Sequence, residues 1–153
     1  MGVEIERKFL VEGSAWREKC IGVMIRQGYL STQASAVVRV RIAADEAFLT
    51  VKGLAEGISR PEFEYPIPLT DAEQLLTMCS GALIEKVRYL VNFEGLQWEV
   101  DVFSGANQGL IVAECELTSA DQAISRPPWL GAEVSDDVRY ANSNLVANPF
   151  TSW

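Results

Sequence analysis

Acidic and basic residues alternate with apolar ones near the amino-terminus, in the run Glu4-Ile5-Glu6-Arg7-Lys8-Phe9. Successive side chains of a β-strand point to opposite faces, so Glu4, Glu6 and Lys8 would share one face. Two carboxylates and an ammonium group make a poor core face. The run therefore predicts a strand that lines a polar site.

The same spacing recurs along the chain. Acidic pairs separated by one residue are Glu62/Glu64, Glu99/Asp101 and Glu114/Glu116, and basic pairs are Arg39/Arg41 and Lys86/Arg88. The residue between the members of each pair is apolar, so each strand would have one charged and one apolar face. Clustered acids repel one another unless cations offset them, and clustered bases favour an anion. A face that holds both predicts metal ions bound beside a polyanion.

An antiparallel sheet with one face in water is the simpler interpretation, because such sheets commonly alternate apolar and polar side chains. Each charged pair is weak evidence by itself, so the pattern alone leaves both interpretations open. The segregation of acids and bases into separate pairs favours the lined site, since solvated strand faces usually mix Thr, Ser, Lys and Gln.

The composition limits the classes of function. The chain has 153 residues, no histidine and a formal net charge of −8. A chain this acidic is not expected to bind nucleic acid or an anionic membrane through its outer surface. Without histidine, a His-dependent triad, a His-ligated zinc and a histidine general base are excluded, so acid–base chemistry would fall to Glu, Asp, Lys or Tyr.

Three widely spaced cysteines, at positions 20, 79 and 115, are typical of reduced thiols rather than of a disulfide framework or a zinc site. The chain has no signal-peptide pattern and no run of about 20 apolar residues. We therefore expect a cytoplasmic protein without a membrane partner, and one domain over residues 1–153. The sequence does not specify the oligomeric state; a homodimer through an apolar exterior is compatible with it.

The expected elements are mostly strands, at residues 3–11, 23–32, 37–42, 48–52, 62–67, 84–93, 97–103 and 110–117. Short helices are expected around Trp16, from a capping box at 70–73 to Gly81, near 119–125, and after Ser135. These elements indicate an α+β fold with an antiparallel sheet. A closed barrel with a polar interior would gather the charged pairs in one place, and Trp98 and Phe63 would pack between its outer face and the helices.

The ordered set of motifs resembles the CYTH superfamily, also called the triphosphate tunnel metalloenzymes. The motifs that carry the resemblance are Glu4-x-Glu6-x-Lys8, Arg39-x-Arg41, Thr50-x-Lys52, Glu62-x-Glu64, Lys86-x-Arg88, Glu99-x-Asp101, Glu114-x-Glu116 and Arg139-Tyr140-x-Asn142. The runs Arg26-Gln27-Gly28-Tyr29-Leu30 and Pro127-Pro128-Trp129 resemble the short bacterial members. The resemblance implies an eight-stranded antiparallel closed β-barrel with a few flanking helices, which binds a triphosphate inside.

The family motif, together with the preference of Mg²⁺ and Mn²⁺ for carboxylate oxygens, predicts the metal ligands Glu4, Glu6, Glu114 and Glu116. The residues expected to bind the phosphate chain are Lys8, Arg39, Arg41, Lys52, Arg60, Lys86, Arg88 and Arg139. Arg60 could instead be an ordinary edge charge, and Arg139 could cap the last helix. The remaining acids, Glu62, Glu64, Glu99 and Asp101, would orient the bases or hold metal-bound water.

The resemblance implies hydrolysis of inorganic triphosphate to diphosphate and phosphate by a metal-activated water. Relatives with matching positions suggest that Lys86 protonates or stabilises the leaving oxygen and that Tyr29 tunes it, while a core or rim role is the alternative for Tyr29. Class IV adenylyl cyclase and thiamine triphosphatase are alternatives within the family. A non-catalytic polyphosphate- or nucleotide-binding module is the alternative from another class. Every acid of the motif is present, which favours an enzyme.

Overall fold

The computed structural model describes residues 2–18 and 20–153. Its strands are β1 (Val3–Val11), β2 (Gly22–Gln33), β3 (Ala36–Ala43), β4 (Glu46–Lys52), β5 (Ser59–Ile67), β6 (Ser80–Phe93), β7 (Leu96–Phe103), β8 (Ile111–Glu116) and β9 (Leu130–Glu133). The α-helices are α1 (Leu69–Thr77) and α2 (Asn142–Leu145), and the 3-10 helices are η1 (Ala15–Arg17), η2 (Gly105–Asn107), η3 (Val138–Tyr140) and η4 (Phe150–Ser152). Within the described residues, no helix has the length and apolar character needed to cross a membrane.

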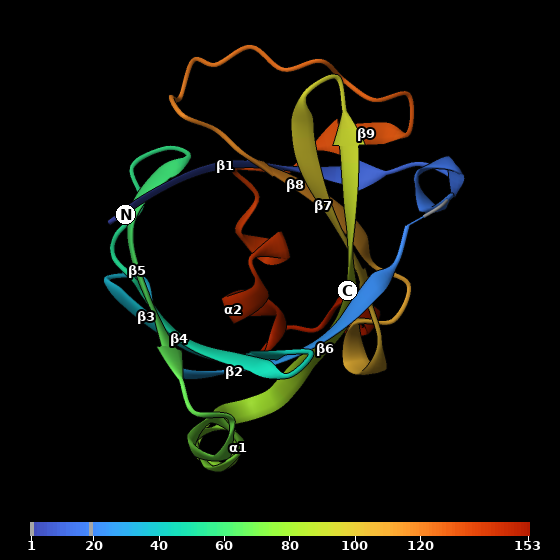
Figure 1. The fold of residues 1–153 in the computed structure, drawn as a ribbon. Helices are drawn as coiled ribbons and strands as arrows, with labels where there is room; N and C mark the ends of the chain where they lie inside the picture. The colour runs from blue at the N-terminus through green and yellow to red at the C-terminus, as the bar shows by residue number, and fades with distance from the viewer. Residues whose placement is uncertain (1, 19) are drawn as a thin grey trace.

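The strands form one antiparallel sheet in the order β5-β4-β3-β2-β6-β7-β8-β1-β9. An additional antiparallel pairing of β1 with β5 closes the sheet, so eight strands make a barrel and β9 extends it beside β1 (Figure 1). The predicted closed eight-stranded barrel is confirmed, and β9 is an addition that the sequence pattern did not predict. A turn at Glu94-Gly95 joins β6 to β7, and both residues have the positive φ (46° and 81°) that a tight hairpin turn favours.

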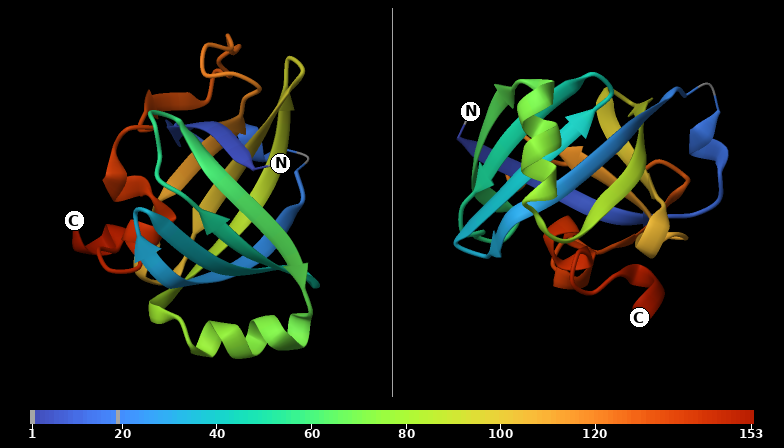
Figure 2. Two further views of the ribbon diagram at one scale, coloured as in Figure 1. Left: turned by 90° about the vertical axis from the view of Figure 1, so that its left-hand side faces the viewer. Right: turned by 90° about the horizontal axis from the view of Figure 1, so that it is seen from below.

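Helix α1 covers the outer face of β3 and β4 (Figure 2). Its buried residues Ala72 and Leu76 pack against Val40, Ile42 and Ala47, which point outward from the barrel. The barrel therefore carries part of its apolar core outside the sheet.

The predicted bounds of this helix were wrong at both ends. Helix α1 begins at Leu69, directly after Pro68, and no side chain caps its first turn. Pro68 has a φ of −59°, which is compatible with a helix that starts directly after it. The helix therefore begins before the expected capping box at 70–73. The helix ends at Thr77, and Gly81 lies within β6.

A second outer cluster lies over β1, β7 and β8. Its centre is Trp98, whose ring makes edge contacts with Phe9 and Trp129 at centroid distances of 5.6 Å and 5.9 Å. Phe63, by contrast, is 48% exposed on the outer face of β5. The expectation that Phe63 packs beneath a helix was wrong, because the contacts of α1 centre on β3 and β4.

The chain between β8 and β9 has turns but no helix at 119–125, contrary to the prediction. The side-chain oxygen of Gln122 accepts hydrogen bonds from the backbone N–H and the hydroxyl of Thr118, at 2.7 Å and 2.9 Å. Such side-chain bonds to the local backbone compete with helix formation.

The carboxy-terminal segment closes one end of the barrel. Tyr140 and Leu145 pack against Ile84, Phe103 and Val112, all of them buried. In Figure 1, which looks through the ring of strands, α2 lies across the opening. Apolar packing at this end therefore leaves the charged interior bounded by a floor.

Replacement of Leu145 by Ala tests this floor. Leu145 is 1% exposed, and a Leu→Ala change at such a site costs about 2–5 kcal/mol of unfolding free energy. Urea denaturation measures the loss. Leu54→Ala is the control, because Leu54 is 63% exposed and should change stability by less than about 0.5 kcal/mol. Equal effects at the two positions would contradict the packing described for α2.

Candidate active site

Cross-strand register places the charged motifs on the inner face of the barrel. Lys8 of β1 lies opposite Glu114 of β8, and Glu114 lies opposite Glu99 of β7. On the other side, Lys52 of β4 lies opposite Glu62 of β5. Because side chains alternate between faces, this register turns the charged set of each strand into the same interior space.

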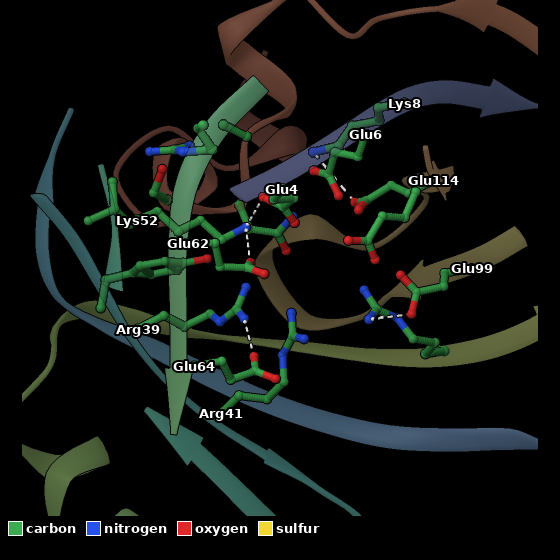
Figure 3. A pocket seen from close by; sticks show the side chains of 18 of the residues that line it. Glu4, Glu6, Lys8, Arg39, Arg41, Lys52, Glu62, Glu64, Glu99 and Glu114 are labelled. Atoms are coloured by element: carbon green, nitrogen blue, oxygen red, sulfur yellow. Dashed lines mark hydrogen bonds and ion pairs between the residues drawn. The ribbon is translucent and has the colours of Figure 1, made fainter. Parts of the chain in front are cut away.

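The interior is a cavity of about 240 Å³ that seven acidic and seven basic side chains line (Figure 3). Every residue that the sequence predicted for the site borders this cavity except Asp101 and Arg139: the lining set is Glu4, Glu6, Lys8, Tyr29, Arg39, Arg41, Lys52, Arg60, Glu62, Glu64, Lys86, Arg88, Glu99, Glu114 and Glu116. The solvated-face interpretation is wrong, because these side chains converge rather than spread over an open surface.

The cavity continues into a second one of about 360 Å³. Glu4, Glu6, Lys8 and Arg60 border both spaces. The second cavity is also lined by residues 134–138 and by the segment between β4 and β5. The interior is therefore extended, with the amino-terminal acids at the junction of its two parts.

Arg139 is not brought to the cavity. Its side chain is 53% exposed, and its guanidinium donates hydrogen bonds to the Asp137 carboxylate at 2.8–3.3 Å. It also lies over the Trp153 ring, 4.9 Å from the centroid. This placement agrees with the alternative role of Arg139 beside the last helices.

The carboxylates at one side of the cavity are held by lysines. Lys52 Nζ lies 2.9 Å from Glu4 and 3.3 Å from Glu62, and Lys8 Nζ lies 3.6 Å from Glu114. Burial opposes ionisation of Glu4, but Lys52 outweighs it and holds the pKa of Glu4 below its usual value. Burial likewise opposes ionisation of Glu114, while Lys8 and other bases lower its pKa strongly.

Glu6 is the carboxylate whose charge is least compensated. Burial raises the pKa of Glu6 well above its usual value, and the charges of Glu114 and Glu4 raise it further. Glu6 also lies directly opposite Glu116 across the β1–β8 pair, where like charges destabilise a sheet. A cation bound here would relieve this repulsion.

These acids suit a hard divalent cation, because Mg²⁺ and Mn²⁺ prefer carboxylate oxygens. Within residues 2–18 and 20–153, no three acidic or thiol side chains are already gathered as a metal-binding group. Lys52 and Lys8 occupy carboxylate oxygens instead. Each lysine engages one oxygen of its carboxylate, and the donor set fits the ion.

A basic wall, made of the guanidinium groups of Arg39, Arg41 and Arg88, forms another part of the cavity. Arg39 donates to Thr50 at 3.1 Å and to Glu64 at 3.4 Å, while its buried Nε has no hydrogen-bond partner. Burial lowers the pKa of Arg41 to about 10, and the neighbouring Arg39 and Arg88 charges contribute to the lowering. A buried unpaired donor and crowded guanidinium groups are suited to an anion.

Asp101 lies behind the wall and anchors two bases. It is fully buried and accepts two hydrogen bonds from Arg88, at 2.8 Å and 2.9 Å. Burial would raise its pKa, but Lys86 and Arg88 hold the pKa of Asp101 below its usual value. Asp101 therefore orients bases, which is one of the roles that the sequence analysis assigned to it.

Lys86 is 1% exposed and lies 2.9 Å from Asp101. Burial lowers its pKa to about 7; Asp101 opposes this lowering, while the Arg88 and Arg41 charges add to it. An ammonium group with a pKa near neutrality exchanges protons readily, which suits an acid–base residue.

Sequence reasoning missed two polar residues that contact this lysine or its neighbours. Asn142 Oδ1 accepts from Lys86 Nζ at 3.0 Å, and Gln27 contacts Tyr29, Arg41 and Asn142. The sequence could have indicated Gln27, because it lies two residues before Tyr29 and so shares the inward face of β2 with it. Asn142 was part of the quoted carboxy-terminal motif, but without a role.

Comparisons with known proteins agree with this geometry. A model of the CYTH domain family matches residues 2–147. A protein named inorganic triphosphatase from Acetivibrio thermocellus is 48% identical over 154 residues, which covers 100% of this chain and 99% of that protein. Another of the same name, from Nitrosomonas europaea, is 41% identical over 147 residues and covers 94% of this chain and 96% of that protein.

Solved structures share the barrel. One described as an inorganic triphosphatase has a TM-score of 0.68 at 38% identity and covers 93% of this chain and 96% of the other. A protein from Pyrococcus furiosus has a TM-score of 0.59 at 19% identity, covering 77% of this chain and 80% of the other, so that likeness concerns the fold alone. The extent of the family match and the identity to full-length relatives show that the chain belongs to the CYTH family.

Proposed function

We propose that this protein is a metal-dependent inorganic triphosphatase, which cleaves inorganic triphosphate to diphosphate and phosphate inside the barrel. The observation that carries the proposal is the cavity of about 240 Å³ that seven acids and seven bases line. A small chamber lined mostly by charged side chains suits a compact polyanion bound together with cations. Two CYTH relatives of nearly equal length carry the name inorganic triphosphatase, which supports the substrate class.

The basic wall binds the phosphate chain. Arg39 and Arg41 offer planar guanidinium groups that match phosphate oxygens, whereas Lys8 and Lys52 act as compact charges. Arg88 is held by Asp101 and Glu99, with one contact to Glu99 at 3.1 Å, so it presents a fixed positive charge to the cavity. Phosphoryl transfer depends mainly on such positioning and charge neutralisation.

Glu4, Glu6, Glu114 and Glu116 would hold Mg²⁺ or Mn²⁺. When bound, the ion supplies Lewis acidity that neutralises phosphate charge and lowers the pKa of water. The side chains of this acidic group also restrict where the phosphate chain can lie, because uncompensated carboxylates repel it.

Lys86 and Tyr29 act on the leaving group. As a water oxygen bonds to the terminal phosphorus and releases a proton to solvent, the bond from that phosphorus to the bridging oxygen breaks, and the bridging oxygen becomes part of diphosphate. Lys86 stabilises the charge that develops there or donates a proton to it. Tyr29, which borders the cavity, donates a hydrogen bond to the same oxygen.

The lining favours an inorganic substrate over a nucleotide. Among the described residues that border the cavity of about 240 Å³, Tyr29 is the single aromatic one, and Val37 and Ala141 are the apolar ones. An adenylyl cyclase must seat an adenine ring, and aromatic or apolar side chains usually line pockets for such rings. Thiamine triphosphate presents the same requirement for its thiazole ring.

Phosphate release from tripolyphosphate, ATP and thiamine triphosphate tests this function, each with Mg²⁺, Mn²⁺ or EDTA. We expect release from tripolyphosphate that EDTA abolishes. Glu4→Gln with Glu6→Gln should lower kcat/KM at least about 100-fold, because metal-bound charge stabilisation contributes several kcal/mol. Glu46→Gln, which changes an exposed carboxylate, should leave the rate unchanged.

Other outcomes identify the alternatives. Formation of cyclic AMP and diphosphate from ATP, without tripolyphosphate hydrolysis, would move the protein to the cyclases. Tight triphosphate binding without turnover of any substrate would make it a binding module and contradict the proposed catalytic roles.

The low pKa of Lys86 has a consequence for stability. In the unfolded chain this lysine keeps a pKa near 10.5, but burial lowers it to about 7 in the folded protein, where Asp101, Arg88, Arg41 and Glu114 surround it. Between these values the unfolded state binds more protons, so the Lys86 contribution to stability rises with pH.

Chemical denaturation between pH 7 and pH 9 measures this effect. The free energy of unfolding of the wild type should rise relative to Lys86→Met by up to about 1.4 kcal/mol per pH unit. Subtraction of the Lys86→Met curve removes the contribution of other titrating groups. Parallel curves for the two proteins would show that Lys86 stays charged throughout this range.

A further inference from the structure

Two amide side chains, the buried Gln27 and the half-buried Asn142, connect Arg41 to Lys86 and Tyr29. Gln27 is fully buried on β2, and its Oε1 accepts a hydrogen bond from Arg41 Nε at 2.8 Å. A guanidinium group can only donate, so this contact fixes which end of the amide is oxygen. Gln27 Nε2 must therefore point away from Arg41, toward Tyr29 and Asn142.

The donor end of Gln27 makes two contacts. Nε2 donates to the Tyr29 hydroxyl oxygen at 3.0 Å and to Asn142 Oδ1 at 3.3 Å. Asn142 Oδ1 also accepts from Lys86 Nζ at 3.0 Å, and an ammonium group can only donate. Arg41 fixes the orientation of Gln27, and the N–H donor of Gln27 in turn requires the oxygen of Asn142 to face it, so the hydrogen-bond network has one direction.

This arrangement decides where the remaining protons point. The Tyr29 oxygen accepts from Gln27, and the hydroxyl donates to no other described residue, so its proton is free for a group in the cavity. Lys86 uses one proton toward Asp101 and one toward Asn142, which leaves a third. Tyr29 and Lys86 both border the cavity.

We propose that Gln27 and Asn142 are positioning residues, which aim one proton each of Tyr29 and Lys86 at the bridging oxygen of a bound triphosphate. This inference rests on the proposed function for its substrate. Gln27 does not border the cavity and acts through Tyr29, whereas Asn142 borders the cavity and its role here is to position Lys86. Their effect should appear in kcat rather than in KM, since the arginines and lysines that bind the phosphates are unchanged.

Gln27→Glu tests the direction of these protons with almost no change in shape. The carboxylate still accepts from Arg41 but cannot donate to Tyr29, so the tyrosine hydroxyl turns to donate to it and its proton leaves the cavity. We expect kcat for tripolyphosphate to fall about 10- to 100-fold, as for other orienting partners, and KM to change less than about threefold. Gln97→Glu is the matched control, because it makes the same charge change at an exposed amide.

A double-mutant comparison separates positioning from general damage. Tyr29→Phe should lower kcat in the wild-type background but cost little more in Gln27→Glu, where the hydroxyl is already withdrawn. Equal losses from Tyr29→Phe in both backgrounds would overturn the proposal, as would equal kcat values for Gln27→Glu and Gln97→Glu.

The Asn142→Leu variant and the resonance of Tyr29 give two further measurements. If Gln27→Glu does not fold, Asn142→Leu should lower kcat without raising KM, whereas Asn144→Leu in the same helix should not. The ¹³Cζ resonance of Tyr29 is independent of turnover. Its chemical shift should change in Gln27→Glu and remain unchanged in Gln97→Glu. An unchanged shift in Gln27→Glu would overturn the hydrogen-bond network, even if triphosphate is not the substrate.

Discussion

The structure depends on mutual compensation of charge inside a closed barrel. An isolated buried charge costs several kcal/mol, so acids and bases that share an interior must pair or bind ions. Lys52 between Glu4 and Glu62, and Asp101 between Lys86 and Arg88, supply most of this pairing. The compensation is least complete at two residues: Glu6, whose pKa is raised, and Arg41, whose pKa is lowered. These two places are where a cation and a polyanion would each be stabilised.

A polar interior requires the apolar core to lie elsewhere. Alternation along each strand sends Val40 and Trp98 outward, where α1 and the chain around Trp129 cover them. A one-residue slip in the register of a strand would exchange its faces, turning its apolar side chains into the charged interior and its charged side chains outward onto the apolar clusters. The fold and the site are consequently specified by the same alternation, which explains why the charged motifs extend along nearly the whole chain.

The period of two in the sequence predicted the strands and which charges share a face, but it left open whether that face lies in water or lines an interior, and the resemblance to the CYTH superfamily implied the interior. The period could not predict features that depend on local competition or on distant contacts. Pro68 moved the start of α1, and the Gln122 side chain replaced a helix by turns. Arg139 has the residue type of a phosphate ligand, but Asp137, two residues away, pairs with it outside the cavity. Gln27 is uncharged, so its role emerges only from the cations that three-dimensional packing places around it.

The carboxy-terminal segment joins stability to chemistry. Helix α2 places Leu145 in the apolar floor and Asn142 on the Lys86 ammonium. A four-residue helix has little stability of its own, so the packing of Leu145 and its neighbours must hold Asn142 in place. The apolar floor therefore does more than close the barrel. It fixes the position of an acceptor for Lys86. Loosening of this floor would therefore disturb the hydrogen bond of the Lys86 ammonium group before it disturbed the arginines of the wall.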